Sequence, residues 1–219
     1  MPVRLCDHPL AQHLLGRLRD RNTPPDQYRR YAHSLSTLLA LEATRDIPVA
    51  RFTVETPITR TLAAQLDQGL AVVPVLRAGL GMLEPFLNLF PDVAVGYIGL
   101  ERNEDTAEAR RYYAKLPVLD TRFVICLDPM LATGGSAAQA IHLLKANRAA
   151  QVKMVCVLAT PEGVAKLESE HPEVEIITAS VDEGLNERKY IVPGLGDFGD
   201  RLYGTSDMPP GLRDLPGDH

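Results

Sequence analysis

The chain has 219 residues, of which 45% are hydrophobic and 23% are charged, and its formal net charge is −5 at pH 7. These values describe an ordinary globular protein and exclude a collagen-like, coiled-coil or wholly disordered chain. The acidic balance disfavours non-specific binding to nucleic acid, because a phosphate backbone needs a basic protein face. We expect one domain over residues 1–206 and a surface tail over residues 207–219, which is poor in apolar residues.

Apolar patterning and cysteine usage indicate a cytoplasmic protein that does not enter a membrane. No apolar run reaches the roughly 18–20 residues that a bilayer span needs, and residues 1–7 lack the apolar core of a signal peptide. The cysteines lie far apart, without a C-x-x-C pair. Cys126 and Cys156 fall inside apolar runs, so we expect buried thiols and a reducing compartment.

The N-terminal region predicts two helices that form a packing arm. Leu10, Leu14 and Leu18 recur every four residues, as on one face of a helix. Pro24-Pro25 then begins a second pattern, and proline is tolerated there because the first N–H groups of a helix have no internal partner. The apolar positions of the second helix are three and four residues apart: Tyr28, Tyr31, Leu35, Leu38 and Leu39.

The middle of the chain predicts a parallel sheet. Short apolar runs, rich in valine and isoleucine, are continuous rather than alternating, which suits strands buried on both faces. Helical spacing occurs at residues 137–144 and from Pro161 to about His171, so strands and helices alternate as in an α/β domain. The apolar runs cover residues 70–76, 93–100, 123–127, 152–159 and 174–179.

The most informative stretch is residues 123–136. A buried strand ends at Asp128, and Thr133-Gly134-Gly135-Ser136 begins a helix shortly afterwards. Because the first N–H groups of a helix are unpaired and partly positive, this phosphate loop (residues 128–136) can hold an anion. Asp128, at the carboxyl end of its strand, is placed to accept from sugar hydroxyls. The pattern predicts a phosphorylated sugar, although a simple capped helix shares it, and the lysine of a nucleoside-triphosphate P-loop is missing.

Three further stretches place polar residues or glycines next to predicted strands. Arg77 follows an apolar run and can grip a diphosphate in a fork, or form a surface ion pair. Residues 99–117 make a long polar excursion, either a lid or a solvated hairpin. Residues 190–199, which we call the base loop, are rich in glycine. This loop can read a planar ring through main-chain hydrogen bonds, or be a plain turn.

In this order and spacing, the stretches closely resemble the uracil phosphoribosyltransferases of the type I phosphoribosyltransferase fold. The resemblance runs from about Asp7 to Thr205. Most type I relatives carry two consecutive acids where this chain has Asp128-Pro129, and the uracil branch typically carries Asp-Pro. The matching pieces are residues 8–10, 73–81, 102–106, 128–136, 179–186 and 190–201.

The resemblance implies that uracil reacts with 5-phosphoribosyl 1-diphosphate (PRPP) to give UMP and diphosphate. It implies that Arg77, Arg102 and Asp197 are catalytic. The residues expected to bind PRPP are Arg77, Arg102, Asp128, Pro129, Met130, Leu131, Ala132, Thr133, Gly134, Gly135, Ser136 and Asp197. The residues expected to bind uracil, chiefly by main-chain groups, are Ile191, Gly196, Asp197 and Phe198.

The resemblance also implies the overall shape and the partners. The expected fold is a parallel-sheet α/β domain in which the N-terminal arm and the C-terminal loop form a small hood over the base. Mg²⁺ is expected to be held mainly by the substrate diphosphate and water, with no protein metal site. Homo-oligomers and activation by GTP are expected from bacterial members of the family. Glu101, next to Arg102, departs from the aromatic residue of many relatives and weakens the case for Arg102.

Other functions remain open on the residues alone. The main alternative is a non-catalytic regulator that binds pyrimidine nucleotides on the same fold, but a version that binds RNA needs a basic face, which the net charge of −5 disfavours. A purine or orotate phosphoribosyltransferase would need a different base loop. A uridine kinase would need the missing P-loop lysine.

Overall fold

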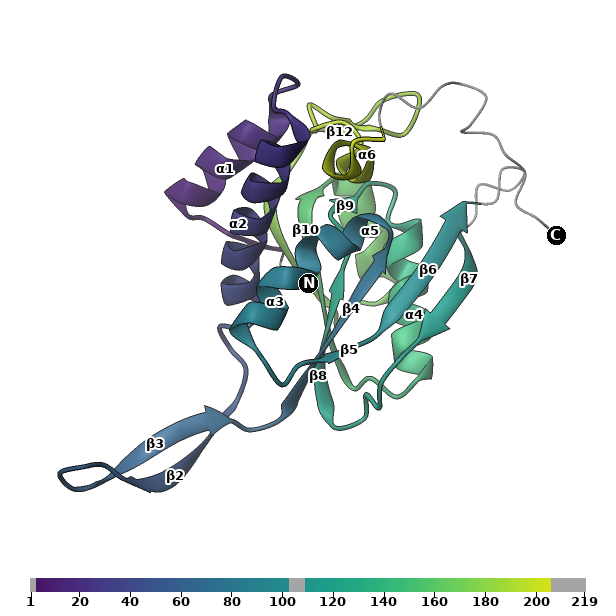
Figure 1. Ribbon diagram of the computed structural model, residues 1–219. Helices are drawn as coiled ribbons and strands as arrows, with labels where there is room; N and C mark the ends of the chain where they lie inside the picture. The colour runs from purple at the N-terminus through teal and green to yellow at the C-terminus, as the bar shows by residue number, and fades with distance from the viewer. Residues whose placement is uncertain (1–2, 103–108, 206–219) are drawn as a thin grey trace.

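The computed structural model describes residues 3–102 and 109–205, and the centre of this part is a nine-stranded, mainly parallel sheet. The sheet has the order β1-β11-β10-β8-β4-β6-β7, with β5 beside β4 and β9 beside β10 (Figure 1). β7 is antiparallel to β6, and the other pairs are parallel, so the predicted α/β fold is confirmed. The strands are β1 (Val3–Leu5), β4 (Gly69–Leu76), β5 (Ala94–Val95), β6 (Tyr97–Arg102), β7 (Ala109–Lys115), β8 (Arg122–Leu127), β9 (Met130–Leu131), β10 (Gln151–Ala159) and β11 (Glu175–Val181).

One predicted strand is divided in two. The apolar run at residues 93–100 predicts a single strand, whereas the structure has β5 and β6 on either side of Gly96, both paired with β4. A Cβ atom at Gly96 would lie 2.9 Å from Leu116 and from Pro117, so the chain approaches the segment after β7 closely here. Glycine permits this approach and weakens the interior of a strand, which explains the break.

Helices cover both faces of the sheet. The helices α1, α2, η1, α3 and α6 share a core on one face, and α4 and α5 pack on the other (Figure 1). Neighbouring residues of β4 alternate between the two cores: Leu70 and Val72 face the first, Ala71 and Val73 the second. This two-sided burial explains the continuous apolar runs. The helices are α1 (Pro9–Arg19), α2 (Pro25–Ala43), η1 (Ala78–Met82), α3 (Leu83–Leu89), α4 (Gly135–Ala146), α5 (Pro161–Glu170) and α6 (Phe198–Tyr203).

The predicted N-terminal arm is confirmed as α1 and α2. Leu18 and Tyr28 are buried between the arm and the rest of the molecule. A buried lysine ties the end of the arm to the sheet: Lys153, on β10, contacts Asp46 just after α2 and lies 3.0 Å from a carboxylate oxygen of Glu175 on β11. Burying a lysine without a partner charge is costly, so this cluster specifies the position of the arm on the sheet.

A hairpin projects from the body between α2 and β4 (Figure 1). It consists of β2 (Val49–Glu55) and β3 (Arg60–Leu66), which pair only with each other within the described residues. No pattern in the sequence predicts this hairpin. Its residues are largely exposed, so no buried face imposes the alternation by which a strand is recognised.

The three cysteines are buried and form no disulfide, which confirms the expected burial of Cys126 and Cys156. Burial raises the pKa of the Cys156 thiol to about 12, so this group is unreactive near neutral pH. Within the described residues, no helix combines the length and the apolar character needed to cross a bilayer.

Candidate active site

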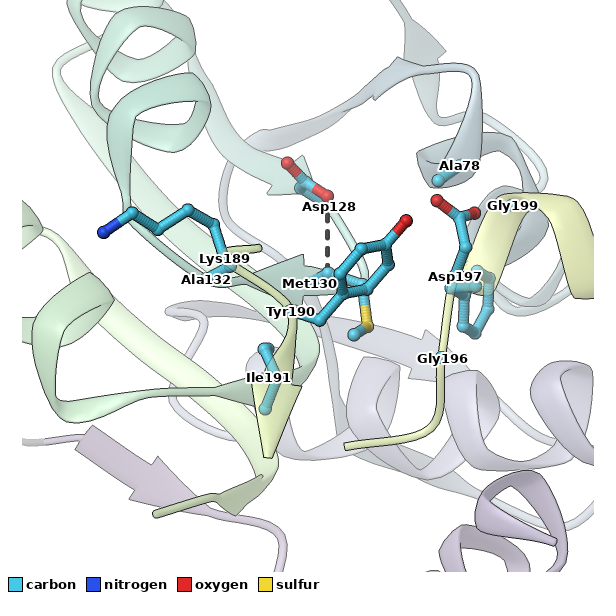
Figure 2. A pocket seen from close by; sticks show the side chains of 11 residues that line it. Ala78, Asp128, Met130, Ala132, Lys189, Tyr190, Ile191, Gly196, Asp197 and Gly199 are labelled. Carbon is cyan, nitrogen blue, oxygen red and sulfur yellow. Dashed lines mark hydrogen bonds between the residues drawn. The ribbon is translucent and has the colours of Figure 1, made fainter. Parts of the chain in front are cut away.

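Two adjoining cavities lie beyond the carboxyl end of β8. The larger, of about 230 Å³, opens toward the base loop, and the smaller, of about 180 Å³, lies against the phosphate loop. They share Asp128, Met130, Ala132 and Lys189. The carboxyl edge of the strands is where open α/β sheets bind ligands. The larger cavity, shown in Figure 2, is lined by Ala78, Asp128, Met130, Ala132, Lys189, Tyr190, Ile191, Gly196, Asp197, Phe198 and Gly199.

The smaller cavity is shaped by the start of α4. Gly134, which precedes this helix, has a φ of 78°, in the left-handed region that favours glycine. A Cβ atom at Gly134 would lie 2.8 Å from the carbonyl oxygen of Gly163, so a larger residue does not fit. The unpaired N–H groups of this helix start suit a phosphate group. The loop residues that line the cavity are Asp128, Met130, Leu131, Ala132, Thr133, Gly134 and Ser136.

Two residues of the phosphate loop that are predicted to bind PRPP, Pro129 and Gly135, do not line this cavity. Pro129 is buried at the end of the sheet, where its carbonyl accepts from the backbone N–H groups of Val157 at 2.9 Å and Leu158 at 3.0 Å. Gly135 lines a separate hollow between α4 and α5. Pro129 and Gly135 therefore shape the loop but do not face the cavity, because only part of the turn between β8 and α4 is directed toward it.

Asp128 lies between the two cavities. Its Oδ1 accepts one hydrogen bond, from the backbone N–H of Met130 at 3.3 Å (Figure 2). Burial raises the pKa of Asp128 to about 6, and the Met130 hydrogen bond opposes this shift. A carboxylate has about four acceptor positions, so Asp128 keeps the capacity to accept from the hydroxyls of a sugar.

A buried carboxylate fastens the base loop to α1. Asp182 accepts hydrogen bonds from Arg19 at 2.6 and 2.7 Å, from the Ser180 hydroxyl at 2.9 Å and from the Gly194 N–H at 2.9 Å. Arg19 also donates to the carbonyl of Gly194 at 2.7 Å. Burial acts to raise the pKa of Asp182, but these hydrogen bonds and the charge of Arg19 outweigh it, and the pKa lies below its ordinary value. The loop is therefore held from the arm side.

A second link joins the base loop to the arm through Arg201. Its guanidinium lies 4.4 Å from the centre of the Tyr28 ring and donates to the carbonyls of Leu195 at 2.8 Å and Asp20 at 2.6 Å. The buried ring of Phe198 packs edge-on against Tyr28, with 5.5 Å between ring centres. The arm and the C-terminal loop thus pack together beside the larger cavity.

The residues predicted to contact uracil come together in the structure. Asp197 also caps α6, where its Oδ1 accepts from the N–H of Asp200 at 2.8 Å. A capping carboxylate has a defined position, because its hydrogen bond holds the side chain at the helix start. The four residues predicted to bind uracil all line the larger cavity: Ile191, Gly196, Asp197 and Phe198.

The two predicted catalytic arginines are not among the described residues that line the cavities. Arg77 follows β4 with its side chain 64% exposed, and its Nη2 lies 3.9 Å from Oδ1 of Asp200. Its neighbour Ala78 lines the larger cavity, whereas Arg77 does not. Arg102 is the last residue of β6. Its side chain lies outside the described part of the chain, as do residues 103–106 and the predicted tail at 207–219.

Four residues that line the larger cavity are not among the predicted site residues: Ala78, Lys189, Tyr190 and Gly199. Two of them, Lys189 and Tyr190, have long polar side chains (Figure 2). Both lie in an exposed polar turn between β12 (Gly184–Leu185) and β13 (Ile191–Val192), without apolar periodicity. The signal that marks the turn is Asn186, whose side-chain oxygen accepts from the backbone N–H groups of Arg188 and Tyr190, each at 3.0 Å. Asparagine favours such turns, because its side chain bonds to backbone groups nearby.

A loop shaped for phosphate and a glycine-rich loop that can read a planar ring meet at the carboxyl edge of one parallel sheet, with a carboxylate between them. This is the arrangement expected for a phosphoribosyltransferase of the type I fold. The chain is similar to the structure of the AQ2163 protein from Aquifex aeolicus, with a TM-score of 0.89 and 41% sequence identity. The match covers 94% of this chain and 100% of that one.

Sequence comparisons then give the particular family. The family model described as Uracil phosphoribosyltransferase matches residues 5–205. The uracil phosphoribosyltransferase of Streptococcus salivarius is 49% identical over 92% of this chain and 98% of its own. That of Dictyoglomus thermophilum is 48% identical over 93% of this chain and 99% of its own. The chain belongs to the uracil phosphoribosyltransferase family, as the resemblance predicts.

Proposed function

We propose that this chain transfers the phosphoribosyl group of PRPP to uracil, giving UMP and diphosphate. The observation that carries the proposal is the pair of adjoining cavities, one against the phosphate loop and one against the base loop, with Asp128 shared between them. UMP has its phosphate and its base on either side of a ribose, and the cavities offer matching places in the same order. Membership of the family supports the same reaction.

The base loop suits uracil rather than cytosine. Uracil presents an N–H group between two carbonyls, and a main-chain carbonyl flanked by N–H groups complements that edge. Ile191, Gly196 and Phe198 line the larger cavity, and we propose that their main-chain groups meet this edge. Cytosine would turn its N3 lone pair toward the protein carbonyl and leave buried groups unpaired, a mismatch that can lower kcat/KM by about four to five orders of magnitude.

The chemistry needs charge stabilisation rather than a covalent nucleophile. Departure of diphosphate builds positive charge at C1 of the ribose and negative charge on the leaving group. We place Arg77 and Arg102 against the diphosphate, and Asp197 beside it. When bound to the diphosphate and to water, Mg²⁺ would supply positive charge against the negative charge of the leaving group. The weak 3.9 Å pairing of the exposed Arg77 with Asp200 supports this role, since little holds Arg77 back from an incoming anion.

Release of diphosphate tests the proposal. The protein is incubated with PRPP and Mg²⁺, and uracil, cytosine, hypoxanthine and orotate are added separately. We expect release with uracil, and release with cytosine lower by about four orders of magnitude. Comparable turnover of cytosine would contradict the role of the base loop. Tight binding of UMP without release with any base would favour a nucleotide-binding regulator on the same fold.

We further propose a homo-oligomer in a reducing cytoplasm, activated by GTP. The oligomer is supported by the projecting hairpin, since two isolated strands are marginally stable in water. Val49, Leu62 and Leu66 share one face of the hairpin and are 56%, 64% and 42% exposed. The buried free cysteines support a reducing compartment. The proposal for GTP is supported only by the resemblance, and initial rates with and without GTP test it.

A further inference from the structure

Lys189 is a basic residue at the site to which nothing above gives a role. It lines both cavities, and no other described residue that lines either cavity is cationic. The acidic residues lining the cavities are Asp128 and Asp197. In Figure 2 the Lys189 amine lies on the opposite side of the opening from Asp197. Lys189 is thus beside the phosphate loop and away from the place proposed for the diphosphate.

Lys189 stands at a backbone position that favours glycine. Its φ is 64°, in the left-handed region where residues other than glycine are uncommon. The turn is held by hydrogen bonds: the Lys189 N–H donates to the carbonyl of Asn186 at 2.9 Å, and the Asn186 side chain accepts from Arg188 and Tyr190. Glycine would adopt this conformation with less strain, so the conformation alone gives no reason for a lysine here.

The charges of the phosphate loop leave a place for a cation. The loop offers neutral donors, namely backbone N–H groups and the hydroxyls of Thr133 and Ser136, while Asp128 adds negative charge. A phosphate monoester carries roughly 1.5 to 2 negative charges at pH 7. The Lys189 side chain is exposed, and no carboxylate of the described residues pairs with it. Its ammonium is therefore available to offset the phosphate charge without first breaking an ion pair.

We propose that Lys189 is a substrate-binding residue whose ammonium group contacts the 5′-phosphate of PRPP and of UMP. The role depends on the proposed function, since that function brings the 5′-phosphate into the smaller cavity. A charge-assisted hydrogen bond on an exposed lysine corresponds to about a tenfold change in affinity. The contact acts on substrate and product alike, so its loss changes KM for PRPP more than kcat.

Titration calorimetry with UMP, PRPP, uridine and diphosphate tests this role. The variants are Lys189→Gly, which relaxes the backbone, Lys189→Met, which removes only the charge, and Lys189→Arg, which keeps it. Arg188→Ala is the matched control, because Arg188 belongs to the same exposed turn but lines neither cavity. Its backbone N–H, which donates to Asn186, is retained in the variant.

We expect UMP to bind about tenfold more weakly to Lys189→Gly and Lys189→Met than to the wild type. Affinity should be kept in Lys189→Arg and Arg188→Ala, uridine binding should be unchanged throughout, and the Tm of Lys189→Gly should not fall. Equal losses for UMP and uridine, unchanged UMP binding, or a loss confined to diphosphate would each overturn the role of Lys189. A wild type that binds neither UMP nor PRPP would instead overturn the proposed function, and the role of Lys189 with it.

Discussion

At the scale of single residues, the raised pKa of Asp128 lowers the stability of the fold near neutral pH. Burial raises its pKa from an ordinary value of 3.8 to about 6, so the folded protein holds this proton more tightly than the unfolded chain does. The unfolding free energy therefore falls as the pH rises from about 4 to about 6, and it stays lower above that range. A buried carboxylate whose raised pKa costs stability is typical of a functional site.

The variant Asp128→Asn separates stability from binding. Asparagine is neutral at every pH, so the ligand-free variant should have a Tm several degrees above that of the wild type at pH 8 and an equal Tm at pH 4. KM for PRPP should rise at least about tenfold, because asparagine accepts fewer hydrogen bonds from the ribose. Thermal unfolding and steady-state kinetics measure the two effects. Unchanged kinetics with both substrates would show that Asp128 does not hold the sugar.

At the scale of elements, the site depends on a connection between α1 and the base loop. Arg19 and Asp182 are far apart in the sequence, yet they form a double hydrogen bond and together hold both backbone groups of Gly194. Asp182 is 6% exposed, so an unpaired charge there would be costly. The arm thereby positions the base loop, which belongs to a distant part of the chain.

Replacing Arg19 tests this connection. Arg19→Met should lower the unfolding free energy at pH 7 by about 2–3 kcal/mol and raise KM for uracil several-fold, with KM for PRPP little changed. The lowered pKa of Asp182 means that the pair stabilises the fold above the ordinary pKa of 3.8 and that this stability is lost as the pH falls. The difference from the wild type should therefore shrink in acid. Arg17→Met, an exposed change in the same helix, is the control and should alter neither quantity.

At the scale of the whole molecule, the projecting hairpin is the feature that the single chain does not explain. Its strands bury no face of their own: the apolar residues Val49, Leu62 and Leu66 are aligned on one side, and Phe52 is exposed on the other. Aligned apolar residues on an isolated arm are typical of an interaction surface. A second copy of this chain is the partner we propose for it.

Charges on that face should dissociate the oligomer. The double variant Val49→Glu/Leu62→Glu should sediment as a monomer at concentrations where the wild type is associated, because two carboxylates cannot be buried there without partners. Thr61→Glu adds a charge on the opposite face of the same strand, since successive side chains alternate, and should leave the assembly intact. Identical sedimentation of wild type and double variant would exclude this face from the interface.

The sequence by itself determined the class of fold and the loops that form the candidate site. The continuous apolar runs predict buried parallel strands, and Thr133-Gly134-Gly135-Ser136 predicts the phosphate loop, because burial on two faces and unpaired N–H groups leave their signals in neighbouring residues. The same holds for the base loop, whose glycines adopt left-handed conformations at Gly194 and Gly196. Local rules were sufficient wherever the cause lay within one element.

Only the tertiary structure decided which distant residues meet. It joins Arg19 to Asp182, brings Lys189 to both cavities, and leaves Arg77 exposed beside Asp200 rather than lining a cavity. It also divides the strand at Gly96 and projects the hairpin away from the body. These outcomes depend on how separate elements pack and on which charges are paired once packed, and the spacing of residues along a chain does not carry that information.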